Sequence, residues 1–216
     1  MNLPAPKIYC LQCDVSKYFD SIDHQILFSL LRKKIADQKV LWLIKIIVES
    51  SNKESGKGIP IGNLTSQLFA NVYLNESDQF AKHVLRARYY IRYMDDFLFL
   101  NDNKKKLHEI KKQVQEFLED KLKLELHSKK ANIFPADKGI DFLGYQVFGN
   151  YRLLRKSTVK RFIKRTKIYQ KKLRKNEMTK TKFNQSIQSW LAYAKFGNSH
   201  QLRRNLSEKL KVELIK

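Results

Sequence analysis

Residues 86–101 read RARYYIRYMDDFLFLN, with two aspartates between two runs of aromatic and aliphatic side chains. Such runs are typical of strands, so the pattern predicts a β-hairpin in which Arg86–Tyr93 and Phe97–Asn101 flank a turn carrying Asp95 and Asp96. Turns favour aspartate, and a solvated turn is the plainer interpretation of an isolated Asp-Asp pair. Two like charges are costly to place between core strands, however, and this favours a functional role.

A third carboxylate ends another hydrophobic strand, predicted over Ile8–Val15. If this strand lies beside the hairpin, Asp14 converges with Asp95 and Asp96. Hard carboxylate oxygens gathered at one point suit magnesium. Two such ions about 3.5–4 Å apart serve phosphoryl transfer. The pattern therefore predicts a site for two Mg²⁺ ions, with Mn²⁺ as a possible substitute.

The charge of the chain is strongly positive and unevenly distributed. The net charge is +22 over 216 residues, and residues 152–216 hold 20 Lys or Arg against 3 Asp or Glu, a net of +17. Such a surface repels itself unless a polyanion covers it. A nucleic-acid backbone is therefore the expected partner, with an anionic membrane as the alternative.

The sequence lacks the marks of an exported or membrane-spanning protein. No apolar run approaches the roughly 20 residues that span a bilayer, and Met1–Pro6 has no apolar signal core. We therefore expect a cytoplasmic protein with no membrane partner. Cys10 and Cys13 form a Cys-x-x-Cys pattern, which is compatible with a redox or zinc site. Because no second pair follows, two small buried side chains are the favoured interpretation.

Apolar periodicity predicts an α+β unit up to about residue 155, followed by an all-α basic bundle. Asp23 is expected to cap a helix that reaches Ile35, and Thr65 or Ser66 to cap one that reaches about Lys82. Further helices are expected over residues 38–50, 103–121 and 157–175, from Thr181 to Gly197, and over 199–214. A polar loop is expected over 51–58, and strands over 122–126, 131–134, 140–148 and 151–154.

Five segments resemble, in family order, the motifs of reverse transcriptases. They are CDVSKYFDSIDH (13–24), GIPIGNLTSQLFAN (58–71), YMDD (93–96), HSKKA (127–131) and DFLGY (141–145). The resemblance implies a polymerase palm over residues 1–155, with an antiparallel sheet and packed helices, and a basic helical thumb over 156–216. It also implies an RNA-directed DNA polymerase that extends a DNA primer on an RNA template, using deoxynucleoside triphosphates.

Single residues take implied roles from the same resemblance. The metal ligands would be Asp14, Asp95 and Asp96, helped by the Val15 backbone carbonyl. Lys130, with Lys129 as a rival, would protonate the leaving pyrophosphate. The ring of Phe19 would exclude a 2′-hydroxyl, with ordinary core packing as the alternative.

Nucleic-acid contacts are implied as well. The primer end would be supported by Phe142, Leu143, Gly144 and Tyr145. The first thumb helix would bind the backbone through Lys160, Arg161, Lys164, Lys167, Lys171 and Arg174. Trp190 and Tyr193 could stack on bases, although bundle core is the favoured interpretation of Trp190.

The second motif departs from the pattern of many reverse transcriptases. It has Ile61 and Gly62 where Gln-Gly is common, and Ser66-Gln67 where Ser-Pro is common. Ile61, Gly62 and Gln67 are the implied contacts to the incoming nucleotide. This variant resembles the reverse transcriptases of diversity-generating retroelements, which copy RNA with errors at adenines. We therefore expect an error-prone polymerase.

Other interpretations stay open. Only 13 residues precede Asp14, whereas the family's fingers lie before the first motif, so we expect the fingers to be absent or truncated. The alternatives are a group II intron-like or antiphage reverse transcriptase, a non-catalytic nucleic-acid-binding remnant, and a basic membrane-surface or ribosome-associated protein. A basic accessory protein is a further possible partner.

Overall fold

The computed structural model describes residues 7–50 and 56–210, and the chain forms two compact units, 1–135 and 136–216. Three sequence expectations fall partly outside the described residues: Met1–Pro6, the predicted loop at 51–55, and the end of the last predicted helix at 211–214. Among the described residues, no helix is both long and apolar enough to cross a bilayer.

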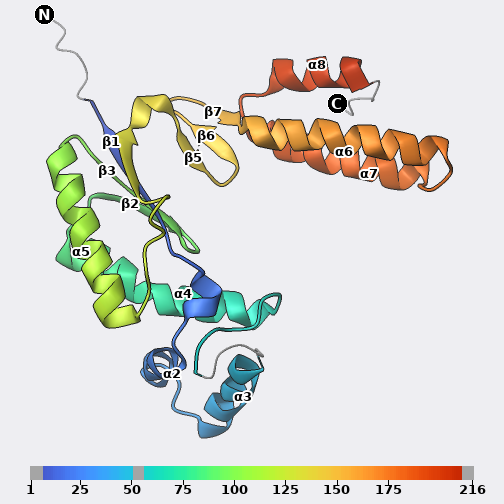
Figure 1. The fold of residues 1–216 in the computed structure, drawn as a ribbon. Helices are drawn as coiled ribbons and strands as arrows, with labels where there is room; N and C mark the ends of the chain where they lie inside the picture. Colours follow the sequence, from blue (N-terminus) through green and yellow to red (C-terminus); the bar gives the residue numbers. More distant parts are fainter. Residues whose placement is uncertain (1–6, 51–55, 211–216) are drawn as a thin grey trace, which may run out of the picture. The chain divides into compact units, whose positions relative to one another are not determined.

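The first unit is built on a four-stranded antiparallel sheet with the order β2-β3-β1-β4 (Figure 1). Its strands are β1 (Tyr9–Asp14), β2 (Tyr89–Tyr93), β3 (Asp96–Asn101) and β4 (Asn132–Pro135). Strand β1 is central and paired along both edges, and its Cys10, Leu11 and Cys13 have no exposed surface. The edge strand β2 instead alternates between exposed and half-buried side chains.

The two cysteines belong to this core. Both thiols are free and buried, and burial raises the pKa of Cys10 and of Cys13 to about 12. A thiol with so high a pKa stays protonated at neutral pH and is neither a good nucleophile nor a ready metal ligand. The structure therefore favours the plain interpretation of the Cys-x-x-Cys pattern, two small core side chains.

Helices cover the sheet and extend the core. Helix α5 (Lys104–Leu122) contacts β1, β3 and β4, and helix α4 (Leu64–Gln79) contacts α5 (Figure 1). The buried Tyr73 of α4 donates a hydrogen bond to the Leu122 carbonyl at the end of α5, at 2.6 Å. A π-helical turn, Phe80–Val84, continues α4 toward the hairpin.

Three shorter helices complete the first unit: α1 (Tyr18–Ser21), α2 (His24–Arg32) and α3 (Gln38–Glu49). The Asp23 carboxylate accepts a hydrogen bond from the Ile26 N–H at 3.1 Å, which confirms the predicted cap of α2. Helix α2 contacts both α3 and α4.

The second unit joins a small sheet to three helices. Strands β5 (Ile140–Phe142), β6 (Tyr145–Val147) and β7 (Arg152–Leu154) form an antiparallel sheet. Helices α6 (Lys156–Arg174), α7 (Lys180–Lys195) and α8 (His200–Leu210) follow. The rings of Phe162 and Trp190 stack at a centroid distance of 3.8 Å and hold α6 against α7. Trp190 is therefore bundle core.

Several boundaries differ from the sequence prediction. Helix α4 starts after Asn63, and no residue at 65 or 66 caps it, while α7 is capped by Thr179 instead of Thr181. Residues 122–126 are not a strand, because α5 runs through Leu122 and only a single bridge pairs Leu126 with Val15. The predicted strand 140–148 is two strands, β5 and β6, joined by a turn.

The compact units separate after Pro135, so the β5–β7 sheet groups with the helices that follow it. The change in charge places the expected palm and thumb boundary at residue 155. The compact units are defined by packing, whereas palm and thumb are defined by function, so the division at residue 155 stays a prediction.

Candidate active site

The strand register brings two of the predicted carboxylates together. Asp14 ends β1, Asp96 begins β3, and the two residues are direct partners across the antiparallel pair. The Asp14 carbonyl accepts a hydrogen bond from the His127 N–H at 2.8 Å, on the side away from β3. Asp14 and Asp96 therefore form a non-hydrogen-bonded pair, the kind in which Cα atoms approach to about 4.5 Å and side chains share one face.

Asp95 lies in the turn between β2 and β3. Tyr93 pairs with Asp96, so Met94 and Asp95 form a two-residue hairpin loop. Met94 has a φ of 55°, in the left-handed region that such loops need at their first position. A non-glycine residue held there costs of order 1–3 kcal/mol, so the surrounding structure must hold it.

Lys130 is the counter-charge of this cluster. Its Nζ lies 2.5 Å from Asp14 Oδ2, and the Asp14 side chain is only 9% exposed. The hydrogen bond to Asp14 raises the pKa of Lys130 above its usual value, and the charges of Asp96 and Asp95 raise it further. The lysine is therefore a cation at neutral pH and interacts with all three aspartates.

Burial raises the pKa of Asp95, and the nearby charge of Asp14 raises it further. Lys130 and the N–H of Asp95 itself act in the opposite direction, because both stabilise the carboxylate. The charge of Asp14 acts on Asp95 because the strand register sets the hairpin turn next to the end of β1.

The residues present fit a divalent cation by chemistry. Carboxylates from Asp14, Asp95 and Asp96 are hard oxygen donors of the kind Mg²⁺ prefers. Within residues 7–50 and 56–210, however, no group of three or more acidic, His or Cys side chains is gathered around a single point. In this arrangement the positive charge beside Asp14 is the ammonium group of Lys130.

The second predicted motif lies at the start of α4 and is largely exposed. Ile61 is 72% exposed, and Gly62 and Gln67 are exposed as well. Gly62 has a φ of 103°, and a Cβ there would meet no atom within 4 Å. These three residues are therefore free of core packing, as a contact surface requires.

Phe19 combines packing with partial exposure. Its ring meets the buried Tyr18 ring edge-on at 5.6 Å, and it packs on the core while remaining half-buried. Its carbonyl accepts a hydrogen bond from the Ile59 N–H at 2.9 Å, which ties the first motif to the second. Both interpretations of Phe19, nucleotide contact and core packing, stay open.

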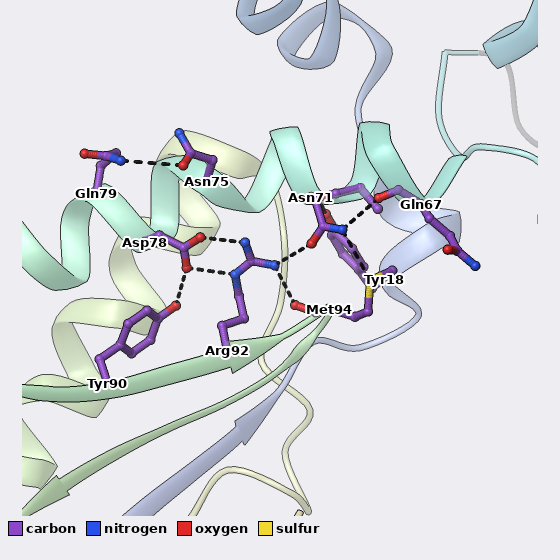
Figure 2. Close-up of polar contacts among 10 residues, drawn as sticks. Tyr18, Gln67, Asn71, Asn75, Asp78, Gln79, Tyr90, Arg92 and Met94 are labelled. Carbon is purple, nitrogen blue, oxygen red and sulfur yellow. Dashed lines mark hydrogen bonds and ion pairs between the residues drawn. The ribbon is translucent and has the colours of Figure 1, made fainter. Parts of the chain in front are cut away.

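A polar network behind the hairpin turn was missed from the sequence (Figure 2). The Arg92 guanidinium of β2 contacts the Asp78 carboxylate of α4 through Nε at 2.7 Å and Nη2 at 2.5 Å. Its Nη1 donates to Asn71 Oδ1 at 3.1 Å and to the Met94 carbonyl at 3.0 Å. Tyr90 donates to Asp78 Oδ1 at 2.7 Å.

One signal in the sequence could have revealed this network. Tyr90 and Arg92 occupy the inward positions of the alternating strand β2, where an arginine needs a buried partner. The partner itself could not be named, because Asp78 lies on a helix one turn from several other polar residues.

The predicted primer-grip residues form the β5–β6 turn of the second unit. Leu143 (φ 50°) and Gly144 (φ 86°) make the turn, and Leu143 is 46% exposed at its tip. The Tyr193 hydroxyl of α7 donates to the Gly144 carbonyl at 3.1 Å, and the Tyr145 hydroxyl donates to the Tyr193 carbonyl at 2.8 Å. The turn is therefore anchored to the helical bundle.

The basic residues predicted to bind a nucleic-acid backbone are all exposed along α6. They are Lys160, Arg161, Lys164, Lys167, Lys171 and Arg174. Helix α6 contains no acidic residue, so no opposite charge within the helix offsets them.

Comparison with known proteins identifies relatives of most of the chain. The profile of the family described as reverse transcriptase (RNA-dependent DNA polymerase) matches residues 1–147. Protein YkfC of Escherichia coli is 27% identical over 177 residues, covering 64% of this chain and 46% of that protein. The group II intron-encoded protein LtrA of Lactococcus lactis subsp. cremoris is 26% identical over 216 residues, covering 68% of this chain and 35% of that protein.

A solved structure shares the fold. Telomerase from Candida tropicalis, in complex with a fragment of telomeric RNA, superposes with a TM-score of 0.53 at 14% sequence identity. The superposition covers 68% of this chain and 29% of that one. This likeness agrees with the α+β class expected from the sequence. The chain spans less than half the length of the curated relatives named here.

The anchored turn predicts a sharp difference between two glycines. An alanine Cβ at position 144 would lie 2.5 Å from the Tyr193 hydroxyl, on a backbone with positive φ. Gly144→Ala should therefore lower the free energy of unfolding by at least about 1 kcal/mol, measured by urea denaturation. Gly56→Ala is the matched control, because Gly56 also has a positive φ, at 83°, and a Cβ there meets no atom within 4 Å. Equal effects of the two substitutions would contradict the anchored turn.

Proposed function

Because the chain belongs to the reverse transcriptase (RNA-dependent DNA polymerase) family, we propose that its aspartate cluster adds deoxynucleotides to a DNA primer on an RNA template. The observation that carries the proposal is the register that pairs Asp14 with Asp96 beside the Asp95 turn. Substrates and partners are part of the proposal, because the chain covers only a fraction of its relatives.

Asp14, Asp95 and Asp96 are the proposed metal ligands. Bound Mg²⁺, or Mn²⁺, would activate the primer hydroxyl and neutralise charge on the triphosphate. Asp14 directs its carbonyl toward His127, on the side away from β3. Since backbone carbonyls alternate between the two edges of a strand, the Val15 carbonyl points toward β3. This direction supports Val15 as an additional oxygen ligand.

Lys130 is the proposed proton donor to the leaving pyrophosphate. Its raised pKa keeps the proton in place at neutral pH. Its side chain is 58% exposed, which gives it freedom to leave Asp14. If Asp14 held a divalent cation, its carboxylate would no longer need Lys130 as a counter-charge, and we propose that the ammonium group would then serve the phosphates.

The remaining roles concern the nucleotide and the nucleic acid. Ile61, Gly62 and Gln67 are proposed to line the nascent base pair, with Phe19 under the sugar. The Phe142–Tyr145 turn is proposed to support the primer end. Residues 1–155 would act as the palm and 156–216 as a thumb on the nucleic-acid backbone, in a cytoplasmic enzyme.

Two subtypes are supported by different observations. The exposed Ile61 and Gln67 of the second motif support an error-prone enzyme of a diversity-generating retroelement. A relative encoded by a group II intron supports the intron-type alternative. The fidelity of the enzyme distinguishes the two, because only the first requires frequent errors at template adenines.

The metal site predicts loss of nucleotide addition when its ligands are neutralised. Asp95→Asn and Asp96→Asn each keep the side-chain shape and remove one charged ligand, so primer extension in Mg²⁺ should fall by at least about 100-fold. Asp102→Asn, an exposed position beyond β3, is the control and should retain activity. If the unmodified chain binds primer–template but adds nothing, the non-catalytic alternative is favoured.

The exposed isoleucine predicts an effect on accuracy. Ile61→Gln restores hydrogen-bonding capacity at the nascent base pair, so misincorporation opposite template adenine should fall by roughly tenfold, equivalent to about 1.4 kcal/mol. The measurement is sequencing of products extended on an adenine-rich RNA. Leu64→Gln, at an 85% exposed position nearby, controls for added polarity. Unchanged error rates for Ile61→Gln would rule out this role.

The basic helix predicts salt-dependent binding without sequence preference. Replacing Lys160, Lys164, Lys167 and Lys171 with Gln should weaken binding to every primer–template alike. The slope of log K against log salt should fall by about 0.9 for each duplex phosphate that the variant no longer neutralises. The matched control replaces four exposed lysines of α5: Lys104, Lys105, Lys106 and Lys121. Weakening confined to one nucleic-acid sequence would contradict the proposal.

A further inference from the structure

The largely buried guanidinium of Arg92 reaches two different parts of the first unit. Its side chain is only 11% exposed, and two of its nitrogens meet both oxygens of Asp78 on α4. This fork-shaped pairing is geometrically specific and stronger than a neutral hydrogen bond. The Tyr90 hydroxyl also binds Asp78, so the carboxylate cannot easily turn away. Arg92 is therefore fixed relative to α4.

The third nitrogen of the fixed guanidinium holds the hairpin turn (Figure 2). Nη1 of Arg92 donates to the Met94 carbonyl at 3.0 Å and to Asn71 Oδ1 at 3.1 Å. Asn71 in turn places its Nδ2 3.5 Å from the Met94 sulfur and 3.0 Å from the Gln67 carbonyl. Met94, the residue with left-handed backbone, is thus held at its carbonyl and at its side chain.

The held carbonyl is connected to the carboxylate of Asp95 through a single rigid group. The Met94 C=O and the Asp95 N–H belong to the same planar peptide unit, so fixing one direction fixes the other. The Asp95 Cα lies in the same plane, and the Asp95 side chain projects from it. The direction of the Met94 carbonyl therefore sets the point from which the Asp95 carboxylate extends.

We propose that Arg92 is a positioning residue, which aims the Asp95 carboxylate at the Asp14 side of the site by holding the Met94–Asp95 peptide. This role deepens the proposed polymerase site and rests on it. Arg92 itself touches neither substrate nor metal in the proposal. Asp78 and Asn71 act through Arg92, because they set the position of the guanidinium.

A purely stabilising ion pair is the competing explanation. In that explanation the half-buried Arg92–Asp78 pair only holds β2 against α4, which requires no contact beyond those to Asp78. Only the positioning role requires the hydrogen bond from Arg92 Nη1 to the Met94 carbonyl. Lysine can keep a charge beside Asp78 but lacks the planar fork that reaches both groups at once.

The test compares Arg92→Lys with the unmodified chain, labelled with ¹⁵N-aspartate. In metal-free protein, the amide resonance of Asp95 should shift in Arg92→Lys, while that of Asp23 at the remote α2 cap stays in place. Binding of Mn²⁺, followed by electron paramagnetic resonance, should weaken about tenfold. Arg88→Lys, at an exposed position next to β2, is the matched control and should change neither.

Asn71→Ala keeps the test decisive if Arg92→Lys fails to fold. Asn71 is exposed, so its replacement should spare folding yet shift the Asp95 resonance in the same direction. An unchanged Asp95 resonance in a folded Arg92→Lys or Asn71→Ala protein would overturn the positioning role. Failure of the proposed metal site would be a separate result. Mn²⁺ binding would then be the same in Asp95→Asn as in the unmodified chain, independently of the result for Arg92→Lys.

Discussion

The pairing of β1 with β3 is the constraint on which the first unit depends. In this register the buried pairs Leu11 with Phe99 and Cys13 with Phe97 lead directly to Asp14 with Asp96. A slip by one residue would turn every core side chain of β1 to the opposite face. The hydrophobic pattern of the two strands therefore also sets the meeting of the carboxylates. The same strand register therefore satisfies both the packing of the core and the geometry of the site.

That meeting creates an electrostatic cost that the structure offsets locally. Burial and the charge of Asp14 both raise the pKa of Asp95, and the ammonium group of Lys130 acts against them. Lys130 lies on the segment that follows the Val15–Leu126 bridge and bonds to Asp14 from the side of β4. A cation of higher charge density would compete for the same oxygens. The fold thus supplies its own counter-ion for Asp14, on a lysine side chain that is 58% exposed.

The elements that periodicity predicts well are those whose side chains face one core. The β2–β3 hairpin, the strand ending at Asp14 and the cap at Asp23 are confirmed by the structure. The split of residues 140–148 into two strands was missed because Leu143, a residue that disfavours positive φ, makes the turn with Gly144. The roles assigned to Phe19, Ile61 and the α6 lysines remain predictions, since they concern contacts to a nucleotide and to nucleic acid.

Tertiary contacts explain what local patterns could not. Six described non-glycine residues have positive φ, and two of them, Met94 and Leu143, form hairpin turns that carry predicted site residues. Each turn is held by a side chain outside it: Arg92, anchored on α4, binds the Met94 carbonyl, and Tyr193 of α7 binds the Gly144 carbonyl. A strained turn persists only where its surroundings determine it. In the first unit α4 holds the turn through Arg92, and in the second unit α7 holds the turn directly through Tyr193. The geometry of each candidate site therefore depends on packing against a neighbouring helix rather than on the turn sequence alone.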